Sequence, residues 1–175
     1  MNPLVHAELS WLGTFRLAQR RDRLLVTLAG VLPDLDGLTL LFGEESYGRW
    51  HHVVTHGVFA AVVVTAGLTA FAQQRARVAA LAFAMFHLHL ACDLAGSGPG
   101  WPITYLWPLS ARELSWRGQW NLASWQNTLI GLVATLAVLG CAVPLGRTVV
   151  ELFSPTADAK VVAAVRARLR RGPPE

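Results

Sequence analysis

Residues 78–94 read VAALAFAMFHLHLACDL, an apolar stretch broken only by His87, His89 and Asp93. A helix that crosses a membrane needs roughly 20 predominantly apolar residues, and this stretch is close to that length. Ionisable side chains at membrane depth are costly unless they face the protein interior, where they mark functional sites. Residues 78–94 therefore predict a membrane helix that carries chemically active groups.

Three further stretches are candidates for membrane helices: residues 57–72, residues 128–146 and residues 24–43. The last is interrupted by Pro33 and two aspartates, so it could be broken or re-entrant. Hydrophobic residues make up 53% of the 175 residues and charged residues 15%, against roughly a quarter charged in a soluble domain. We therefore predict an all-α fold: a polytopic membrane helix bundle with about four membrane-embedded helices around a polar His/Asp cluster.

The lysines and arginines are distributed unevenly over the segments that connect these stretches. If all four stretches cross the membrane, one side holds only Arg49, Arg112 and Arg117, and the other side holds all the remaining basic residues. The positive-inside rule assigns the richer side to the cytoplasm. The sequence thus predicts a multi-pass protein of the inner (cytoplasmic) membrane with both termini cytoplasmic, and with residues 44–56 and 96–127 outside.

This distribution also bears on domains and partners. We expect a membrane helical domain over residues 1–147, followed by a cytoplasmic amphipathic helix and basic tail over residues 148–175. The basic residues do not form one face with interleaved aromatics, so no nucleic acid partner is expected. The expected partners are membrane lipid and a small amphiphilic or lipid substrate.

Helical spacing indicates which polar groups of the first stretch share a face. His89 and Asp93 are four positions apart and therefore point from the same side of a helix. His87 lies about 200° away from His89 and faces elsewhere. We interpret His87 as an interhelical hydrogen-bonding residue and the other two as a pair of metal ligands.

The acidic segment GVLPDLDG, residues 30–37, allows two interpretations. Pro33 suits the first turn of a new helix, so Asp34 and Asp36 could cap that helix. In extended backbone, residues two apart share a side, so both carboxylates could instead point toward one ligand. Two acids inside an apolar run favour ligation.

Two other segments contain histidines at candidate positions. In WHHVVTHG, residues 50–57, helical spacing favours His52 with His56, whereas a short loop would let His51 reach the same centre. Near the N-terminus, His6 and Glu8 are two apart, which on a helix places them on different faces. We therefore do not expect both of them to bind one metal.

Together these segments resemble the family of bacterial membrane-bound, metal-dependent hydrolases. The matching pieces are VHAELSW (5–11), GVLPDLDG (30–37), HHVVTHG (51–57), HLACD (89–93) and GPGWPITYLWPLS (98–110). The resemblance implies metal-site roles for His6, Asp34, Asp36, His51, His56, His89 and Asp93.

One position departs from the pattern of that family. The family commonly has arginine after the first histidine of its H-R-G-x-T-H element, and His52 occupies this place here. Either His52 replaces an anion-binding arginine by a weaker, pH-sensitive donor, or it is itself a ligand in place of His51.

Seven candidate ligands exceed the three protein ligands of a single catalytic zinc, so we expect one or two divalent ions, most simply Zn²⁺ or Mn²⁺. Two ions about 3.5 to 4 Å apart suit phosphoester chemistry through a metal-activated water. His52 and Asp36 are the candidates for general acid or base. The sequence thus predicts a membrane-embedded metal-dependent hydrolase acting on a phosphoester or another amphiphilic or lipid substrate.

Two other classes of function fit the same residues. Intramembrane histidines and aspartates also form ion paths in metal or proton transporters. A metal held by a closed set of ligands could instead stabilise a non-catalytic membrane protein. The tryptophan-rich segment 96–126 could anchor the protein at the headgroup level or line a lipid-binding groove.

Overall fold

The computed structural model describes residues 1–170, and every element in this part of the chain is helical apart from an isolated bridge between Ile103 and Leu114. The predicted all-α fold is therefore confirmed for these residues. The elements are α1 (Pro3–Leu12), α2 (Arg20–Ala29), η1 (Leu32–Phe42), α3 (Glu44–Trp50), α4 (Val58–Ala70), α5 (Arg75–Gly96), α6 (Trp125–Cys141), η2 (Val149–Leu152) and α7 (Pro155–Arg170).

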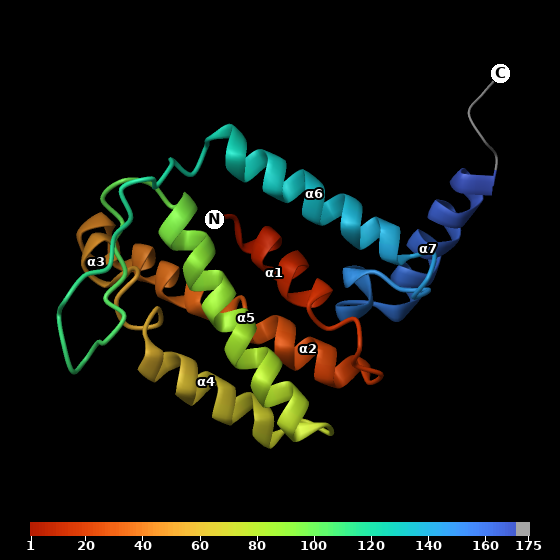
Figure 1. Cartoon of the computed structure of the whole chain (residues 1–175), viewed down its shortest axis with the longest axis horizontal. Coiled ribbons are helices and arrows are strands. Elements are labelled where there is room, and N and C mark those ends of the chain that lie inside the picture. Colours follow the sequence, from red (N-terminus) through yellow and green to blue (C-terminus); the bar gives the residue numbers. More distant parts are fainter. Residues whose placement is uncertain (171–175) are drawn as a thin grey trace.

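Helix α5 is the central element of the bundle (Figure 1). Its 22 residues span about 33 Å at 1.5 Å per residue. One stripe of the helix is buried against α2 and α4, with apolar residues Val78, Ala82 and Phe86 followed by His89 and Asp93. Burial of an apolar stripe is the main force that packs a helix into a core. The same stripe therefore carries the core and the polar cluster.

The prediction of four membrane-embedded helices is not confirmed. Within residues 1–170, α5 alone is long and apolar enough to span a membrane, and α2 with η1 forms a second span only if the pair, bent by 52°, is counted as one. Helices α4 and α6 are shorter, at 13 and 17 residues. Each apolar run is longer than its helix, because α4 gives way to a turn at Phe71 and α6 ends ahead of Pro144.

The N-terminal helix α1 folds back along the bundle between α5 and α6 (Figure 1). Met1 contacts Asp93 at the C-terminal end of α5. At the other end of α5, Asp22 accepts hydrogen bonds from the backbone of Gln73 and Gln74. Met1 and Asp22 therefore lie near opposite ends of α5, so residues 1–23 run along the bundle and are not one connecting segment on one side, as the predicted topology assumed. The sequence did not indicate this, because the ten residues of α1 are too few to be recognised as crossing the bundle.

The C-terminal region closes the end of the bundle at which α2 begins. The predicted amphipathic helix is α7, in which Val162 is buried while Leu169 is exposed. Asp158 of α7 accepts hydrogen bonds from the backbone and side chain of Thr148. The predicted domain boundary between residues 147 and 148 thus adjoins a packed polar network. Residues 171–175 of the predicted basic tail lie outside the described residues.

A buried ion pair joins this region to the bundle. Glu151 of η2 accepts hydrogen bonds from Arg23 of α2, at 2.6 Å from Nε to Oε1, and from Trp11 of α1, at 2.9 Å. All three side chains are buried. A buried carboxylate is tolerated only when its charge and its lone pairs are satisfied, so this pair fixes three elements relative to one another.

Glu151 gives the stability of the protein a pH dependence of predictable sign. Burial would raise the pKa of its carboxyl, but the hydrogen bonds from Arg23 and Trp11 hold that pKa below its ordinary value of 4.5. A carboxylate with a lowered folded pKa stabilises the protein above its unfolded pKa, and this contribution is lost as the pH falls through the folded pKa. We expect the difference in unfolding temperature between wild type and Glu151→Gln, measured in detergent by circular dichroism, to shrink below pH 4.5. A difference that stays constant from neutral to acid pH would contradict this.

Candidate metal centre

The C-terminal half of α5 supplies the first two donor residues, His89 and Asp93. His89 Nε2 lies 2.9 Å from Asp93 Oδ2, as the spacing of four predicted. His89 Nδ1 lies 2.9 Å from the carbonyl oxygen of Gly30, so a proton on Nδ1 is donated there and Nε2 is left for a metal. Glycine is required at position 30 because a Cβ atom would lie 1.8 Å from Ser10 Oγ.

The two aspartates of η1 point to different partners. Asp34 Oδ1 lies 3.7 Å from His89 Nε2. Asp36 instead accepts hydrogen bonds from Nδ1 of His51 at 2.6 Å and from Nδ1 of His56 at 2.8 Å. Residues 32–42 form a 3₁₀ helix with three residues per turn, so positions two apart diverge. The interpretation in which extended backbone points both carboxylates toward one ligand therefore does not hold.

The loop before α4 places its histidines through an unusual backbone conformation. His52 has a φ of 64°, and its backbone N–H donates to Asp36 Oδ2 at 3.0 Å. Its Nδ1 lies 3.4 Å from the carbonyl oxygen of Trp101, and its Nε2 lies 3.9 Å from Asp93 Oδ2. His56 Nε2 lies 3.5 Å from the same oxygen. The left-handed residue turns His52 into the cluster, whereas His51 remains beside Asp36.

Helix α1 adds His6 to the cluster. His6 Nε2 lies 3.3 Å from Asp93 Oδ1, and its ring stacks on that of His89 with centroids 3.9 Å apart. Glu8 points away and accepts a hydrogen bond from Thr135 of α6. The prediction that His6 and Glu8 face different ways is confirmed.

The donor atoms form two groups that share one carboxylate. The first group is His6, Asp34, His89 and Asp93, and the second is His52, His56 and Asp93. Within each group, all donor atoms lie within 4.8 Å of one another. Of the predicted ligands, the structure brings together five with His52, and it leaves out Asp36 and His51.

The chemistry of these donors fits a divalent cation. Imidazole nitrogen and carboxylate oxygen are the ligands that Zn²⁺ and Mn²⁺ accept. Asp34 Oδ2 is buried without a hydrogen-bond partner, which is costly unless a cation satisfies it. The cluster is therefore compatible with metal binding.

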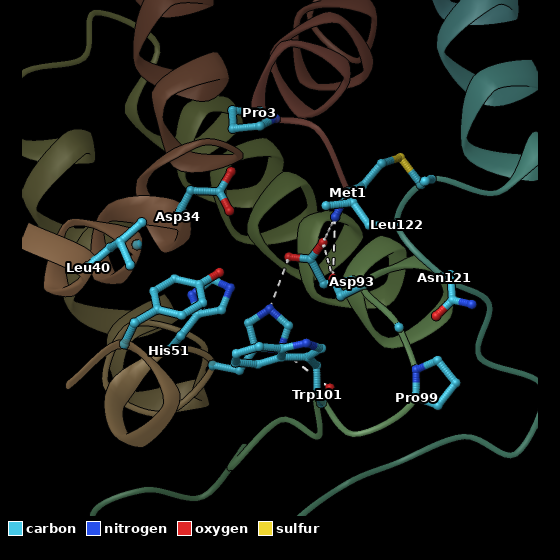
Figure 2. A pocket seen from close by; sticks show the side chains of 16 residues that line it. Met1, Pro3, Asp34, Leu40, His51, Asp93, Pro99, Trp101, Asn121 and Leu122 are labelled. Atoms are coloured by element: carbon cyan, nitrogen blue, oxygen red, sulfur yellow. Dashed lines mark hydrogen bonds and ion pairs between the residues drawn. The ribbon is translucent and has the colours of Figure 1, made fainter. Parts of the chain in front are cut away.

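A cavity of about 720 Å³ gives access to the cluster, with Asp34, His51 and Asp93 on its wall (Figure 2). Trp101 also lines it, so this tryptophan of segment 96–126 has a place beside the cluster. Tyr47 stacks on His51 with ring centroids 4.4 Å apart. The sequence did not single out Tyr47. It could not indicate the carbonyl groups of Gly30 and Trp101, because backbone acceptors carry no residue-type signal.

Comparisons with known proteins define the family but not the chemistry. A family model described as "YdjM inner membrane protein" matches residues 1–165. No curated protein and no solved structure matches the chain. The family description gives a location in the inner membrane and mentions neither hydrolysis nor a metal, so the expected resemblance is supported only at the level of a bacterial membrane protein family. Because the match covers nearly the whole chain, the protein belongs to the YdjM inner membrane protein family.

Proposed function

We propose that this protein is a membrane-embedded metal-dependent hydrolase that acts on a phosphoester or on another amphiphilic or lipid substrate. The observation that carries the proposal is the pair of buried donor groups sharing Asp93 and opening into the cavity. A carboxylate shared by two donor groups is the arrangement expected for two ions about 3.5 to 4 Å apart. When bound, Zn²⁺ or Mn²⁺ would polarise the reacting oxygen of the substrate and activate water.

His51 is the residue placed to move a proton. It lines the cavity, yet it belongs to neither donor group. Asp36 and the ring of Tyr47 hold its imidazole in place, and the hydrogen bond at Nδ1 leaves Nε2 available for proton transfer. His52 and Asp36 were the sequence-based candidates for general acid or base; we assign the general acid role to His51 and a positioning role to Asp36.

The cavity and the core support an enzyme over the two other classes. A purely structural metal has closed coordination, whereas here Asp34, His52 and Asp93 line an open cavity. An ion path would need polar groups along the bundle. Toward the other end of the bundle, α5 buries the apolar residues Phe86, Ala82 and Val78. The charged residues that α2 buries there, Asp22 and Arg23, already have their own hydrogen-bond partners.

The test measures metal content and hydrolysis on the same preparations. We expect detergent-purified wild type to hold one or two ions per chain by mass spectrometry and to hydrolyse p-nitrophenyl phosphate or phosphatidic acid. His51→Ala should retain the ions and lose roughly 10²- to 10⁴-fold in kcat, the usual contribution of a general acid.

Three results would contradict the proposal. A folded wild type that stays free of metal after supplementation with zinc and manganese would refute the metal centre. Metal flux into proteoliposomes without hydrolysis would indicate a transporter. Unfolding on chelation, with no turnover of either substrate before chelation, would indicate a structural metal.

A further inference from the structure

A groove of about 450 Å³ runs between α1 and α6, next to the metal centre. Its polar residues are Asn2 at the N-cap of α1 and Asn127 and Thr128 in the first turn of α6. Val5 of α1 and Gly131 and Leu132 of α6 line it one turn farther along the helix. The polar lining residues of the groove therefore lie at the end near Asp93, together with Met1, Pro3 and Leu122, and the lining farther from Asp93 is apolar.

The groove and the cavity of the metal centre meet at common walls. Met1, Pro3 and Leu122 line both. Figure 2 shows Met1 and Leu122 next to Asp93 on one side of the cavity. A molecule with one end at the donor groups could thus extend past these residues into the groove.

Exposed apolar residues flank the groove, and one turn beyond it the seam of α1 and α6 carries the hydrogen bond from Thr135 to Glu8. Leu4 of α1 is 71% exposed and Leu132 of α6 is 55% exposed, and Leu136 continues the same apolar surface. Gly131 allows the close approach of α1, because a Cβ atom there would lie 3.2 Å from Val5 Cγ2. An apolar groove does not retain water and is suited to an apolar chain.

We infer that the α1–α6 groove binds an acyl chain of the substrate, whose phosphate end lies at the donor groups. The inference rests on the proposed function and specifies its substrate as an acyl-chain amphiphile. A single molecule would then occupy both the cavity and the groove. Its anionic end would lie at the metal centre and its hydrocarbon tail against Val5, Gly131 and Leu132.

The test is photo-cross-linking, which requires no turnover. The probe is phosphatidic acid with a diazirine in its acyl chain, diluted into phosphatidylcholine vesicles that contain the protein. We expect cross-links at Val5, Gly131 and Leu132 to exceed those on the exposed α4 residues Val62 and Val63. Gly131→Leu should lower groove labelling about tenfold, the loss expected when roughly two methylenes leave the groove.

A matched variant on the same helix provides the control. Gly140→Leu adds the same side chain where a Cβ atom meets nothing within 4 Å, so groove labelling should remain at the wild-type level. If Gly131→Leu does not fold, Val5→Phe narrows the groove from α1, with Leu4→Phe as its exposed control.

The possible failures are distinguishable. Equal labelling of the groove and α4, or unchanged labelling in folded Gly131→Leu, would overturn the acyl-chain site. Hydrolysis of p-nitrophenyl phosphate without groove labelling would overturn the acyl-chain site alone. Groove labelling in a protein that hydrolyses neither substrate would support the groove as a site for an acyl chain, but it would overturn the proposed function.

Discussion

Asp93→Asn is expected to remove all tightly held metal from the purified protein. Asp93 is the one residue common to both donor groups, and its two oxygens face different histidines, with Oδ1 near His6 and Oδ2 near His89. Asparagine keeps the size of the side chain but loses the charge and one acceptor oxygen. We expect affinity to fall more than about 100-fold at both positions, which exceeds the usual effect of a residue that only orients a ligand.

Two companion variants make this prediction specific. Asp36→Asn should weaken metal binding by about 10- to 100-fold, because Asp36 orients His56 without belonging to a donor group. Glu8→Gln should leave the metal content unchanged, since Glu8 bonds Thr135. Mass spectrometry of folded protein measures all three. Equal metal loss in Asp36→Asn and Asp93→Asn would contradict the assignment of Asp93 as the shared ligand.

Arg23→Met should destabilise the protein by about 3–5 kcal/mol, because it removes the hydrogen-bonded cation from the buried carboxylate of Glu151 and leaves only Arg147, whose Nε lies 4.0 Å from Oε1. The loss should appear in unfolding by denaturant in detergent, followed by circular dichroism. The double variant Arg23→Met with Glu151→Leu should recover much of the loss, since replacing a buried pair by apolar residues is often neutral.

The exposed pair of Arg49 and Glu45 provides the comparison. Its side chains are 64% and 87% exposed, so Arg49→Met should change the free energy of unfolding by no more than about 0.5 kcal/mol. If Arg23→Met costs as little as Arg49→Met, then Glu151 does not hold η2 to the bundle.

The helical class and one half of the cluster could be predicted from the sequence because they depend on local periodicity. A spacing of four puts His89 and Asp93 on one face of α5 whatever surrounds the helix. The same argument separated His6 from Glu8 on α1. These predictions need only the helix type, which the apolar pattern indicates.

The roles of the other donors depended on backbone details that residue types do not reveal. Asp34 and Asp36 diverge because the segment is 3₁₀ rather than extended. His52 enters the cluster because its φ is positive, a conformation that is uncommon for a residue with a side chain. The choice between His51 and His52 therefore required the three-dimensional structure.

Hydropathy also gave an incomplete account of the bundle. It recognised the run that became α6, but it could not show that the helix itself has only 17 residues. It did not indicate that α1 runs along the bundle, because ten residues are fewer than a membrane span needs. Tertiary contacts, such as that of Met1 with Asp93, set the position of this helix.

The position of α1 beside α5 also determines when the donor residues can meet during synthesis. His6 and Asp93 are separated by 87 positions, so they come together only after α5 has left the ribosome. By then the chain from α2 to α4 has emerged, whereas α6 and α7 follow later. All the donor residues have therefore emerged before α6, the helix that completes the groove.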